Sequence, residues 1–171
     1  MKLSIIIPCY NEKETIQEIL SRVFSINISP WEKEIIIVDD ASTDGTQNIL
    51  KGFESKVKII YQNINGGKGT AIKRGLEETS GDYILIQDAD LEYNPQDILI
   101  LLNAIDNQKN NVVYGSRNLH HINRRGFYLQ RLGVWFITKL INNLYSKKLT
   151  DVWTCYKLFP KEARGLFVPG G

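Results

Sequence analysis

The segment Asp88-Ala89-Asp90 places two carboxylates one residue apart, directly after the apolar stretch 83–87. At this spacing both carboxylates can turn toward one divalent cation at the end of a strand. Hard oxygen ligands suit Mg²⁺ or Mn²⁺, and magnesium sites commonly combine one or two protein carboxylates with substrate phosphates. Short acidic pairs are also common in loops, so the pair alone leaves an ordinary acidic turn open as an alternative.

Polar residues also follow three other apolar stretches of the chain, at 8–12, 39–44 and 65–70. In an open α/β sheet, ligands bind beyond the carboxyl ends of the strands. These three segments and the aspartate pair are therefore expected to meet at one edge of a sheet. Carboxylates gathered there would repel one another unless a cation or hydrogen-bond donors neutralised them.

The glycine-rich segment 66–70, Gly-Gly-Lys-Gly-Thr, allows two interpretations. Its backbone N–H groups could cradle a phosphate at the start of a helix, or the glycines could simply form a tight turn. The segment does not match a P-loop, and the turn after the first apolar stretch lacks the G-x-G-x-x-G pattern of dinucleotide-binding folds. Taken alone, the tight turn is the simpler interpretation.

The cysteines and histidines form no catalytic pattern. Cys9 and Cys155 are predicted to fill space as small apolar side chains rather than to act as nucleophiles. Two cysteines in a chain of this length do not make a disulfide framework, which favours a reducing compartment. His120 and His121 are predicted to be exposed loop residues, because no acidic residue lies beside them in the sequence.

Apolar stretches alternate with helical patterns and predict the elements that position these residues. The predicted strands cover 3–8, 34–39, 57–61, 83–87 and 112–115. Unbroken apolar runs such as Ile-Ile-Ile-Val are typical of strands buried on both faces of a parallel sheet. Amphipathic spacing at 16–24 and 98–105 predicts helices, and Asp44 and Asn94 suit helix starts. The alternation predicts a mostly parallel α/β layered domain with right-handed crossovers.

The composition is that of one globular domain. The chain has 171 residues, of which 43% are hydrophobic and 23% charged, which excludes a disordered tail, a collagen and a coiled coil. A net charge of +2 does not suggest a nucleic-acid-binding protein. No apolar run approaches the ~18 residues that a membrane span needs. Pro8 and Asn11 interrupt the first apolar stretch, so no secretory signal peptide is predicted.

Charge is distributed unevenly along the chain. Residues 1–110 carry 11 basic and 17 acidic residues, a net of −6, whereas residues 111–171 carry 10 basic and 2 acidic residues, a net of +8. Such a basic segment is either a solvated face or a surface that meets phosphates or an anionic membrane.

A second feature of the basic segment is a helical pattern after the polar stretch 118–126, which is predicted to be a loop. Apolar residues recur there with the spacing of one helix face, at Leu129, Leu132, Phe136, Leu140 and Leu144. The favoured interpretation is a helix that packs on the sheet. The alternative is a helix that lies at a membrane surface, which its aromatic and basic content would suit.

Taken together, the motifs resemble the family 2 glycosyltransferases, most closely the branch of dolichyl-phosphate mannose synthases and polyprenyl-phosphate glycosyltransferases. Six segments match in the family's order over nearly all of the chain, and six spaced motifs are far more specific than one. The matching segments are 4–12, 37–46, 65–70, 87–95, 115–117 and 150–157.

The resemblance implies a GT-A fold, with a Rossmann-like, mostly parallel sheet flanked by helices in a single domain. It implies inverting transfer of a hexose from a UDP- or GDP-sugar to a dolichyl or undecaprenyl phosphate, with Mg²⁺ or Mn²⁺ as cofactor. Residues 1–110 would form a donor-binding half and residues 111–171 an acceptor-side half. The family's catalytic domains generally continue beyond the last of these motifs, so a C-terminally shortened domain is expected.

The resemblance also assigns roles to individual residues, and Asp39 is expected to accept a hydrogen bond from the base. The donor-binding positions are Pro8, Tyr10, Asn11, Glu12, Asp39, Asp40, Lys68, Asp88 and Ala89. The metal positions are Asp88, Asp90 and Glu92, where Glu92 stands in place of the glutamine usual in mannose synthases. The acceptor positions are Arg117, Arg131, Thr154 and Lys157. The catalytic positions are Asp88, Asp90, Arg117 and Asp151.

The acceptor decides whether a general base is needed. A lipid phosphate is already an anion and needs only cations to hold it in line. A saccharide hydroxyl, the alternative acceptor in polysaccharide synthesis, requires a base, for which Asp151 is the candidate. A non-catalytic nucleotide-sugar-binding module is a further alternative. The resemblance places the chain in the cytoplasm, at the cytoplasmic face of a membrane and in peripheral contact with anionic lipid.

Overall fold

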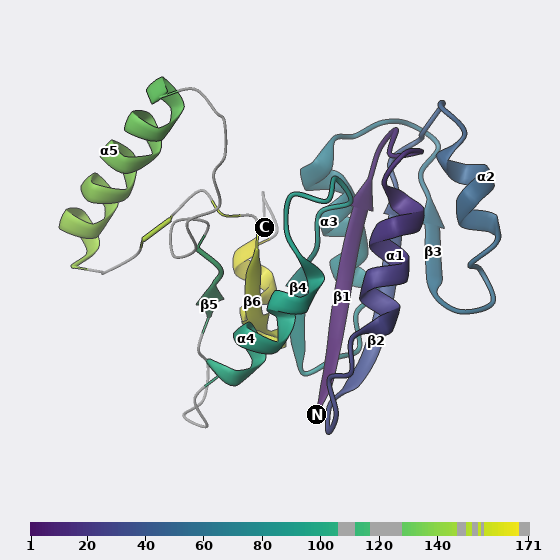
Figure 1. Cartoon of the computed structure of the whole chain (residues 1–171), viewed down its shortest axis with the longest axis horizontal. Coiled ribbons are helices and arrows are strands. Elements are labelled where there is room, and N and C mark those ends of the chain that lie inside the picture. Colours follow the sequence, from purple (N-terminus) through teal and green to yellow (C-terminus); the bar gives the residue numbers. More distant parts are fainter. Residues whose placement is uncertain (106–111, 117–127, 147–149, 152–153, 155, 168–171) are drawn as a thin grey trace.

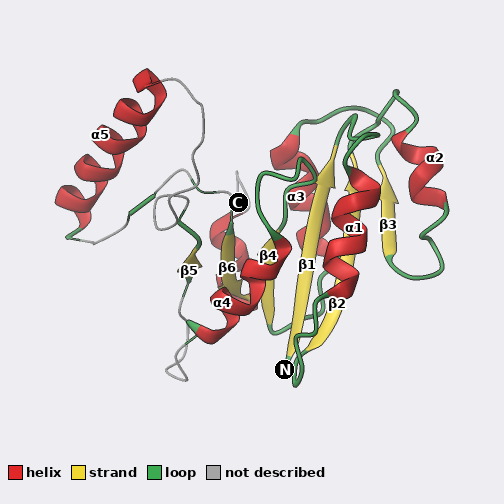
Figure 2. Cartoon of the chain, in the orientation of Figure 1, coloured by secondary structure: helices red, strands yellow, loops and turns green. Residues whose placement is uncertain are grey.

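The computed structural model describes residues 1–105, 112–116, 128–146, 150–151, 154 and 156–167. Six strands in this part of the chain form one sheet in the order β3-β2-β1-β4-β6-β5, with helices on both faces (Figure 1, Figure 2). The prediction of a single, mostly parallel α/β domain is confirmed. The strands are β1 (Lys2–Cys9), β2 (Glu32–Asp39), β3 (Lys58–Tyr61), β4 (Tyr83–Ile86), β5 (Val113–Tyr114) and β6 (Lys157–Pro160).

Strands β1, β2, β3 and β4 form the parallel part of the sheet, and β1 lies at its centre between β2 and β4. Ile5 of β1 pairs with Ile35 of β2 on one side and with Leu85 of β4 on the other. The apolar runs of these strands are buried, as expected for strands covered on both faces. Their carboxyl ends therefore meet at one edge of the sheet, the edge to which the sequence assigns the polar segments.

Helices cover the two faces of the sheet unequally. The core on one face joins β1 to α1 (Ile16–Ser25), α2 (Thr46–Lys51) and α4 (Ile98–Asn103). The other face is covered by α3 (Lys68–Glu77), whose Leu76 packs with Ile6 of β1. The short 3-10 helices Pro95–Asp97 and Lys161–Phe167 precede α4 and follow β6. Helix α3 thus begins at the same sheet edge as the ends of β1 and β4.

Of the six strands in the described part of the chain, β6 is the one that the sequence did not predict. It runs antiparallel between β4 and β5, and Leu158 pairs with both Leu85 and Val113. The four residues of β6 are too short for a clear period, and Pro160 argues against a strand. The tertiary partners β4 and β5 nevertheless bury this segment, and β6 places Lys157, the last residue of the acceptor-side motif, in the sheet next to β4, the strand that leads to Asp88.

Helix α5 (Tyr128–Tyr145) forms as predicted, but the favoured interpretation of its packing is wrong. The helix lies apart from the sheet in Figure 1. The side chains of its apolar stripe that are described, Phe136, Leu140 and Leu144, are exposed, as is Trp135. Among the described residues, no helix combines the length and the apolar character needed to cross a bilayer.

Gly75 sets how closely α3 approaches the sheet, and it carries a testable prediction. A methyl group at Gly75 would lie 2.6 Å from Cγ2 of Ile6 and 3.3 Å from Cγ2 of Val38. Gly75→Ala is therefore expected to lower the free energy of unfolding by about 1–3 kcal/mol, because it overpacks this contact. The control is Gly133→Ala in α5, where a methyl group would meet nothing within 4 Å. That variant should leave stability unchanged or raise it by up to about 1 kcal/mol in urea unfolding. Equal stability of both variants would contradict the close packing of α3.

A second prediction concerns Glu34, which lies at the opposite sheet edge from the polar segments. Its carboxylate accepts hydrogen bonds from the Ser4 hydroxyl, the Ser80 hydroxyl at 2.6 Å and the Ser80 N–H at 2.9 Å, and Lys2 Nζ lies 3.0 Å away. Burial alone would raise the pKa of Glu34, but these partners outweigh it and lower the pKa from 4.5 to about 2. The carboxylate therefore stabilises the fold fully above the unfolded pKa, and this contribution is lost as the pH falls toward 2.

Glu34→Gln is expected to remove this pH dependence. The variant should be less stable than the unmodified protein at pH 7 by about 2–3 kcal/mol, and the difference should shrink as the pH falls from 4.5 toward 2. Denaturant unfolding at a series of pH values measures the difference. If the difference in the free energy of unfolding between the two proteins stays constant down to pH 2.5, the Glu34 carboxylate is not held in its charged form.

Candidate active site

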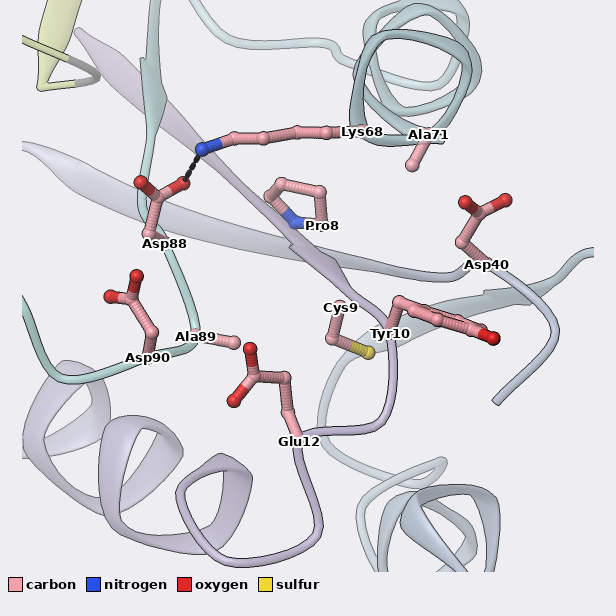
Figure 3. A pocket seen from close by; sticks show the side chains of 10 residues that line it. All are labelled: Pro8, Cys9, Tyr10, Glu12, Asp40, Lys68, Ala71, Asp88, Ala89 and Asp90. Carbon is pink, nitrogen blue, oxygen red and sulfur yellow. Dashed lines mark ion pairs between the residues drawn. The ribbon is translucent and has the colours of Figure 1, made fainter. Parts of the chain in front are cut away.

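A pocket opens at the carboxyl ends of β1 and β4, beside the start of α3 (Figure 3). Eight of its ten lining residues were predicted as site residues from the sequence. The exceptions are Cys9 and Ala71. Cys9 lies between two predicted residues in the sequence, and Ala71 lies one helical turn after Lys68 on the same face of α3. Both could therefore have been predicted from their spacing to the predicted residues. The lining residues are Pro8, Cys9, Tyr10, Glu12, Asp40, Lys68, Ala71, Asp88, Ala89 and Asp90.

Asp88 and Lys68 form an ion pair across one side of this pocket. Lys68 Nζ lies 2.6 Å from Asp88 Oδ1. The Asp88 side chain is almost fully buried, with 7% exposed, whereas 48% of the Lys68 side chain is exposed. Figure 3 shows the lysine side chain extending from the first turn of α3 to the aspartate at the end of β4. A buried carboxylate requires such a partner, because burial without one would be costly.

Asp90 lines the same pocket and is exposed, whereas Glu92 does not line it. Leu91 between them adopts a left-handed conformation with φ of 60°, and the Glu92 N–H donates to Asp90 Oδ1 at 2.9 Å. This turn closes the Asp-x-Asp segment into a compact loop. Within the described part of the chain, no three His, Cys, Asp or Glu side chains are already gathered as a metal-binding group.

Asp40 organises the glycine-rich segment that leads into α3. Its Oδ1 accepts the Gly66 N–H at 2.9 Å and Gln62 Nε2 at 2.6 Å, and its Oδ2 accepts the Gly67 N–H at 2.7 Å. Gly67 has a φ of 80°, which a glycine adopts without strain. These two N–H groups serve the turn and Asp40, so the tight-turn interpretation of this segment holds and a phosphate cradle from them does not.

Asp39 lies behind the pocket rather than on its surface. It is fully buried, and its Oδ2 accepts the Ser42 N–H at 3.1 Å and Gln47 Nε2 at 2.7 Å. The Cys9 thiol lies 3.7 Å from its Oδ1 and donates to it. Contact between Asp39 and a base therefore remains a prediction, and it would require residues that bury Asp39 to move.

Asn11 likewise supports the pocket without lining it. It has a φ of 55°, its N–H donates to Ser42 Oγ at 2.9 Å, and its Oδ1 accepts the Thr43 N–H at 2.8 Å. These bonds tie the loop after β1 to the loop after β2. Asn11 thereby fixes the position of the neighbouring pocket residues Tyr10 and Glu12.

Cys9 behaves as a buried, protonated thiol. Burial raises the pKa of the Cys9 thiol, and the nearby Asp39 carboxylate raises it further. A raised pKa leaves little thiolate, and the thiolate is the reactive form of cysteine. The prediction that Cys9 is a space-filling residue rather than a nucleophile agrees with this environment. Cys155 lies outside the described residues.

The acceptor-side residues are only partly described, and none of the described ones lines the pocket. Thr154 is buried, where it donates to Tyr93 Oη at 3.4 Å and accepts the Tyr156 N–H at 3.1 Å. Asp151 is also buried, with 1% of its surface exposed. Lys157 lies on β6, with Nζ 5.7 Å from the centre of the Tyr114 ring.

Two predicted arginines cannot be placed in the site. Arg117 lies outside the described residues, together with His120 and His121. Arg131 belongs to α5, but its side chain is not among those described. The acceptor-binding and catalytic roles assigned to these arginines remain predictions from the resemblance.

At this sheet edge an aspartate pair, a lysine and the polar loop after β1 surround one pocket. Comparison with known sequence families gives a match over almost the whole chain. Residues 4–165 match the sequence family described as glycosyl transferase family 2. The chain belongs to glycosyl transferase family 2. The family membership that the sequence motifs predicted is confirmed.

A curated relative of this family 2 protein is the dolichol-phosphate mannosyltransferase of Pyrococcus furiosus. The two are 40% identical over 119 residues, which cover 68% of this chain and 33% of the relative. Several curated relatives are named for transfer of a sugar to a polyprenyl phosphate. The chain spans less than half of the length of these relatives.

Solved structures agree with the family. The chain superposes on glucosyl-3-phosphoglycerate synthase of Mycobacterium tuberculosis, solved in complex with UDP, over 94% of this chain and 57% of that chain, with a TM-score of 0.70. The identity is 21%, so this likeness shows the fold, which is that of the GT-A glycosyltransferases. A mannosyltransferase of Pyrobaculum calidifontis, solved with GDP-Man and Mn²⁺, is 27% identical over 57% of this chain and 30% of its own, with a TM-score of 0.52.

Proposed function

We propose that this family 2 glycosyltransferase transfers a hexose, with inversion, from a nucleotide-diphosphate sugar to a polyprenyl phosphate. The observation that carries the donor side is the pocket in which Asp88 and Asp90 lie beside the Lys68 cation. The acceptor class is supported by the names of the curated relatives. The donor is a UDP- or GDP-sugar, as in the solved structures that resemble this chain.

The residues of the pocket fit a divalent cation. An ammonium group already neutralises Asp88 at 2.6 Å, so this carboxylate is arranged to receive a positive charge. Asp90 adds a second carboxylate in the same pocket, and carboxylate oxygens suit Mg²⁺ or Mn²⁺. Support also comes from the Pyrobaculum calidifontis enzyme, which was solved with Mn²⁺. A bound divalent cation would supply Lewis-acid stabilisation of the charge on the leaving diphosphate.

The remaining pocket residues would bind and orient the donor. Tyr10 is half-exposed and offers a ring face and a hydroxyl to the nucleoside, while Asp40 holds the turn from which Lys68 extends. In the proposed reaction the bond between the anomeric carbon and the diphosphate oxygen breaks, and an acceptor phosphate oxygen forms the new bond from the opposite face. The electron pair of the broken bond leaves with the nucleoside diphosphate. Because the acceptor oxygen is already anionic, no proton has to be removed.

Burial of Asp151 bears on the alternative acceptor, a saccharide hydroxyl. A general base must come within hydrogen-bond reach of the proton that it removes. Asp151 is almost fully buried and does not line the pocket, so this arrangement favours the phosphate acceptor over the hydroxyl.

Direct assay tests the proposal. The protein is incubated with radiolabelled UDP- and GDP-sugars, undecaprenyl phosphate or a soluble oligosaccharide, and Mn²⁺, and lipid-extractable label is measured. Label in the lipid phase that depends on Mn²⁺ is the expected result. Label on the oligosaccharide alone would move the acceptor to a saccharide. Donor binding without transfer to any acceptor would indicate a nucleotide-sugar-binding module.

The exposed face of α5 carries a further prediction within this proposal, namely peripheral contact with an anionic membrane surface at the cytoplasmic side. Trp135, Phe136 and Leu140 are exposed, and Lys139 Nζ lies 5.0 Å from the Trp135 ring centre. A helix face of aromatic, apolar and basic residues binds the boundary between head groups and acyl chains. The net charge of +8 in residues 111–171 adds attraction to anionic lipid.

We expect the protein to bind vesicles that contain anionic phospholipid, more weakly as salt rises, because exposed charges are screened over ~8 Å at physiological ionic strength. Exchanging both Trp135 and Phe136 for serine should weaken binding at least about tenfold, since each ring contributes about 1.5–3 kcal/mol when buried. Ile64→Ser, at an even more exposed apolar residue outside α5, is the control. Sedimentation with vesicles measures binding, and equal loss in both variants would contradict a role for α5.

A further inference from the structure

Lys68 is paired with Asp88, the carboxylate to which the metal is assigned. We propose that Lys68 is an exchangeable counterion of Asp88, which leaves the carboxylate when a divalent cation arrives and then binds the diphosphate of the donor. This inference rests on the proposed function and deepens it, because it states how binding of the metal and binding of the donor are coupled. The metal and the nucleoside diphosphate would bind together, and the metal alone only weakly.

The geometry aims Lys68 at this position. Asp40 holds the Gly66 and Gly67 N–H groups, and the left-handed Gly67 turns the chain into α3, whose first residue is Lys68. Figure 3 shows Asp40 and Asp88 on opposite sides of the pocket, with the Lys68 side chain spanning toward Asp88. The turn is therefore anchored on one side while the ammonium group reaches the other.

Charge repulsion makes the lysine and a metal competitors for the same carboxylate. Like charges a few ångströms apart repel one another strongly near a protein surface, and a divalent cation doubles the charge on one side. An ammonium group at 2.6 Å from Asp88 Oδ1 would therefore oppose metal binding at that oxygen. Removing the ammonium without replacing it should raise the affinity of the site for the metal.

The lysine is also the more exposed partner of this ion pair. Nearly half of the Lys68 side chain is exposed and its stem has four rotatable bonds, but Asp88 is buried at the end of β4. A diphosphate entering the pocket offers the displaced ammonium group new anionic partners. Binding of nucleotide would then strengthen metal binding, and by linkage the metal would strengthen nucleotide binding by the same factor.

The test measures Mn²⁺ binding by electron paramagnetic resonance, first with Mn²⁺ alone and then with GDP or UDP added. Lys68→Met should bind Mn²⁺ alone at least about tenfold more tightly than the unmodified protein, because the competing charge is gone. The nucleotide should strengthen Mn²⁺ binding much less in this variant than in the unmodified protein. Lys68→Arg, which keeps the cation, should keep Mn²⁺ binding weak. Lys73→Met, an exposed lysine of the same helix, is the control with the same change of charge and should match the unmodified protein.

The outcomes separate this inference from the proposed function. If Lys68→Met binds Mn²⁺ alone no more tightly than Lys73→Met, the exchange is wrong, while metal use stands wherever nucleotide-dependent Mn²⁺ binding persists. If no form of the protein binds Mn²⁺ with or without nucleotide, the metal of the proposed function is wrong and the exchange falls with it. Circular dichroism checks that each variant is folded, which is expected because residue 68 is exposed at the start of α3.

Discussion

Asp88→Asn is expected to reduce sugar transfer at least about 100-fold while the protein remains folded. Loss of one preorganised electrostatic contact to a developing charge costs about 10²–10³-fold in turnover. Asparagine has the shape of aspartate but no charge, so neither Lys68 nor a divalent cation would be held at this position. The nearly complete burial of Asp88 means that water cannot replace the missing charge.

Transfer of radiolabelled sugar and calorimetric binding of a nucleoside diphosphate, each with and without Mn²⁺, measure the effect. Glu77→Gln is the matched control, because it removes one negative charge from an exposed residue of α3 outside the pocket. The control should retain full activity. Mn²⁺-dependent nucleotide affinity that is the same in Asp88→Asn and Glu77→Gln would remove Asp88 from the site.

Asp40→Asn is expected to have the next largest effect. It should lower both the free energy of unfolding and the affinity for nucleotide. The carboxylate accepts three hydrogen bonds, from Gly66, Gly67 and Gln62, and either orientation of an asparagine amide would set a donor against one of these donors. A donor that is left without a partner costs up to about 1–3 kcal/mol, and these donors are partly buried, so the free energy of unfolding should fall by up to that amount. Nucleotide affinity should fall by about 10–100-fold, the range for residues that orient a ligating group, because the turn that aims Lys68 is loosened.

Denaturant unfolding and nucleotide binding at a temperature where the variant is folded measure these two effects separately. Asp44→Asn is the control, since Asp44 also accepts bonds from a helix start, the Thr46 N–H at 2.9 Å and Oγ1 at 2.6 Å, but lies outside the pocket. The control should lose stability without the loss of nucleotide affinity. A parallel loss of affinity in both variants would show that Asp40 acts through general stability and not through Lys68.

The parallel part of the fold was predictable because its signals are local. The unbroken apolar runs of β1 and β2 can only be buried on both faces, and the amphipathic spacing of α1 is strong over its whole length. The end of each strand then places its following polar residues at a common edge. Eight of the ten pocket residues were found in this way, together with the family resemblance.

Other features depend on partners that are distant in the chain. Strand β6 has four residues and ends in Pro160, and only its pairing with β4 and β5 makes it a strand. The exposure of the apolar stripe of α5 could not be predicted from the sequence either, because an apolar periodicity predicts a helix but not the surface against which the helix packs. Glu92 was assigned to the metal with Asp88 and Asp90, yet the turn at Leu91 leaves it outside the pocket lining.

The sequence by itself determined the α/β class, the edge at which the chemistry lies, and membership of the family, because apolar periodicity and spaced motifs are properties of short segments. Only the tertiary structure decided which role each carboxylate at that edge has. Asp39 and Asp40 are neighbours in sequence, but one is buried behind the pocket against Ser42 and Gln47, and the other holds the turn before α3. Asp88 is paired with Lys68, twenty residues away. A carboxylate's role follows from the donors and cations that the fold brings to it, and those come from segments that no local pattern connects.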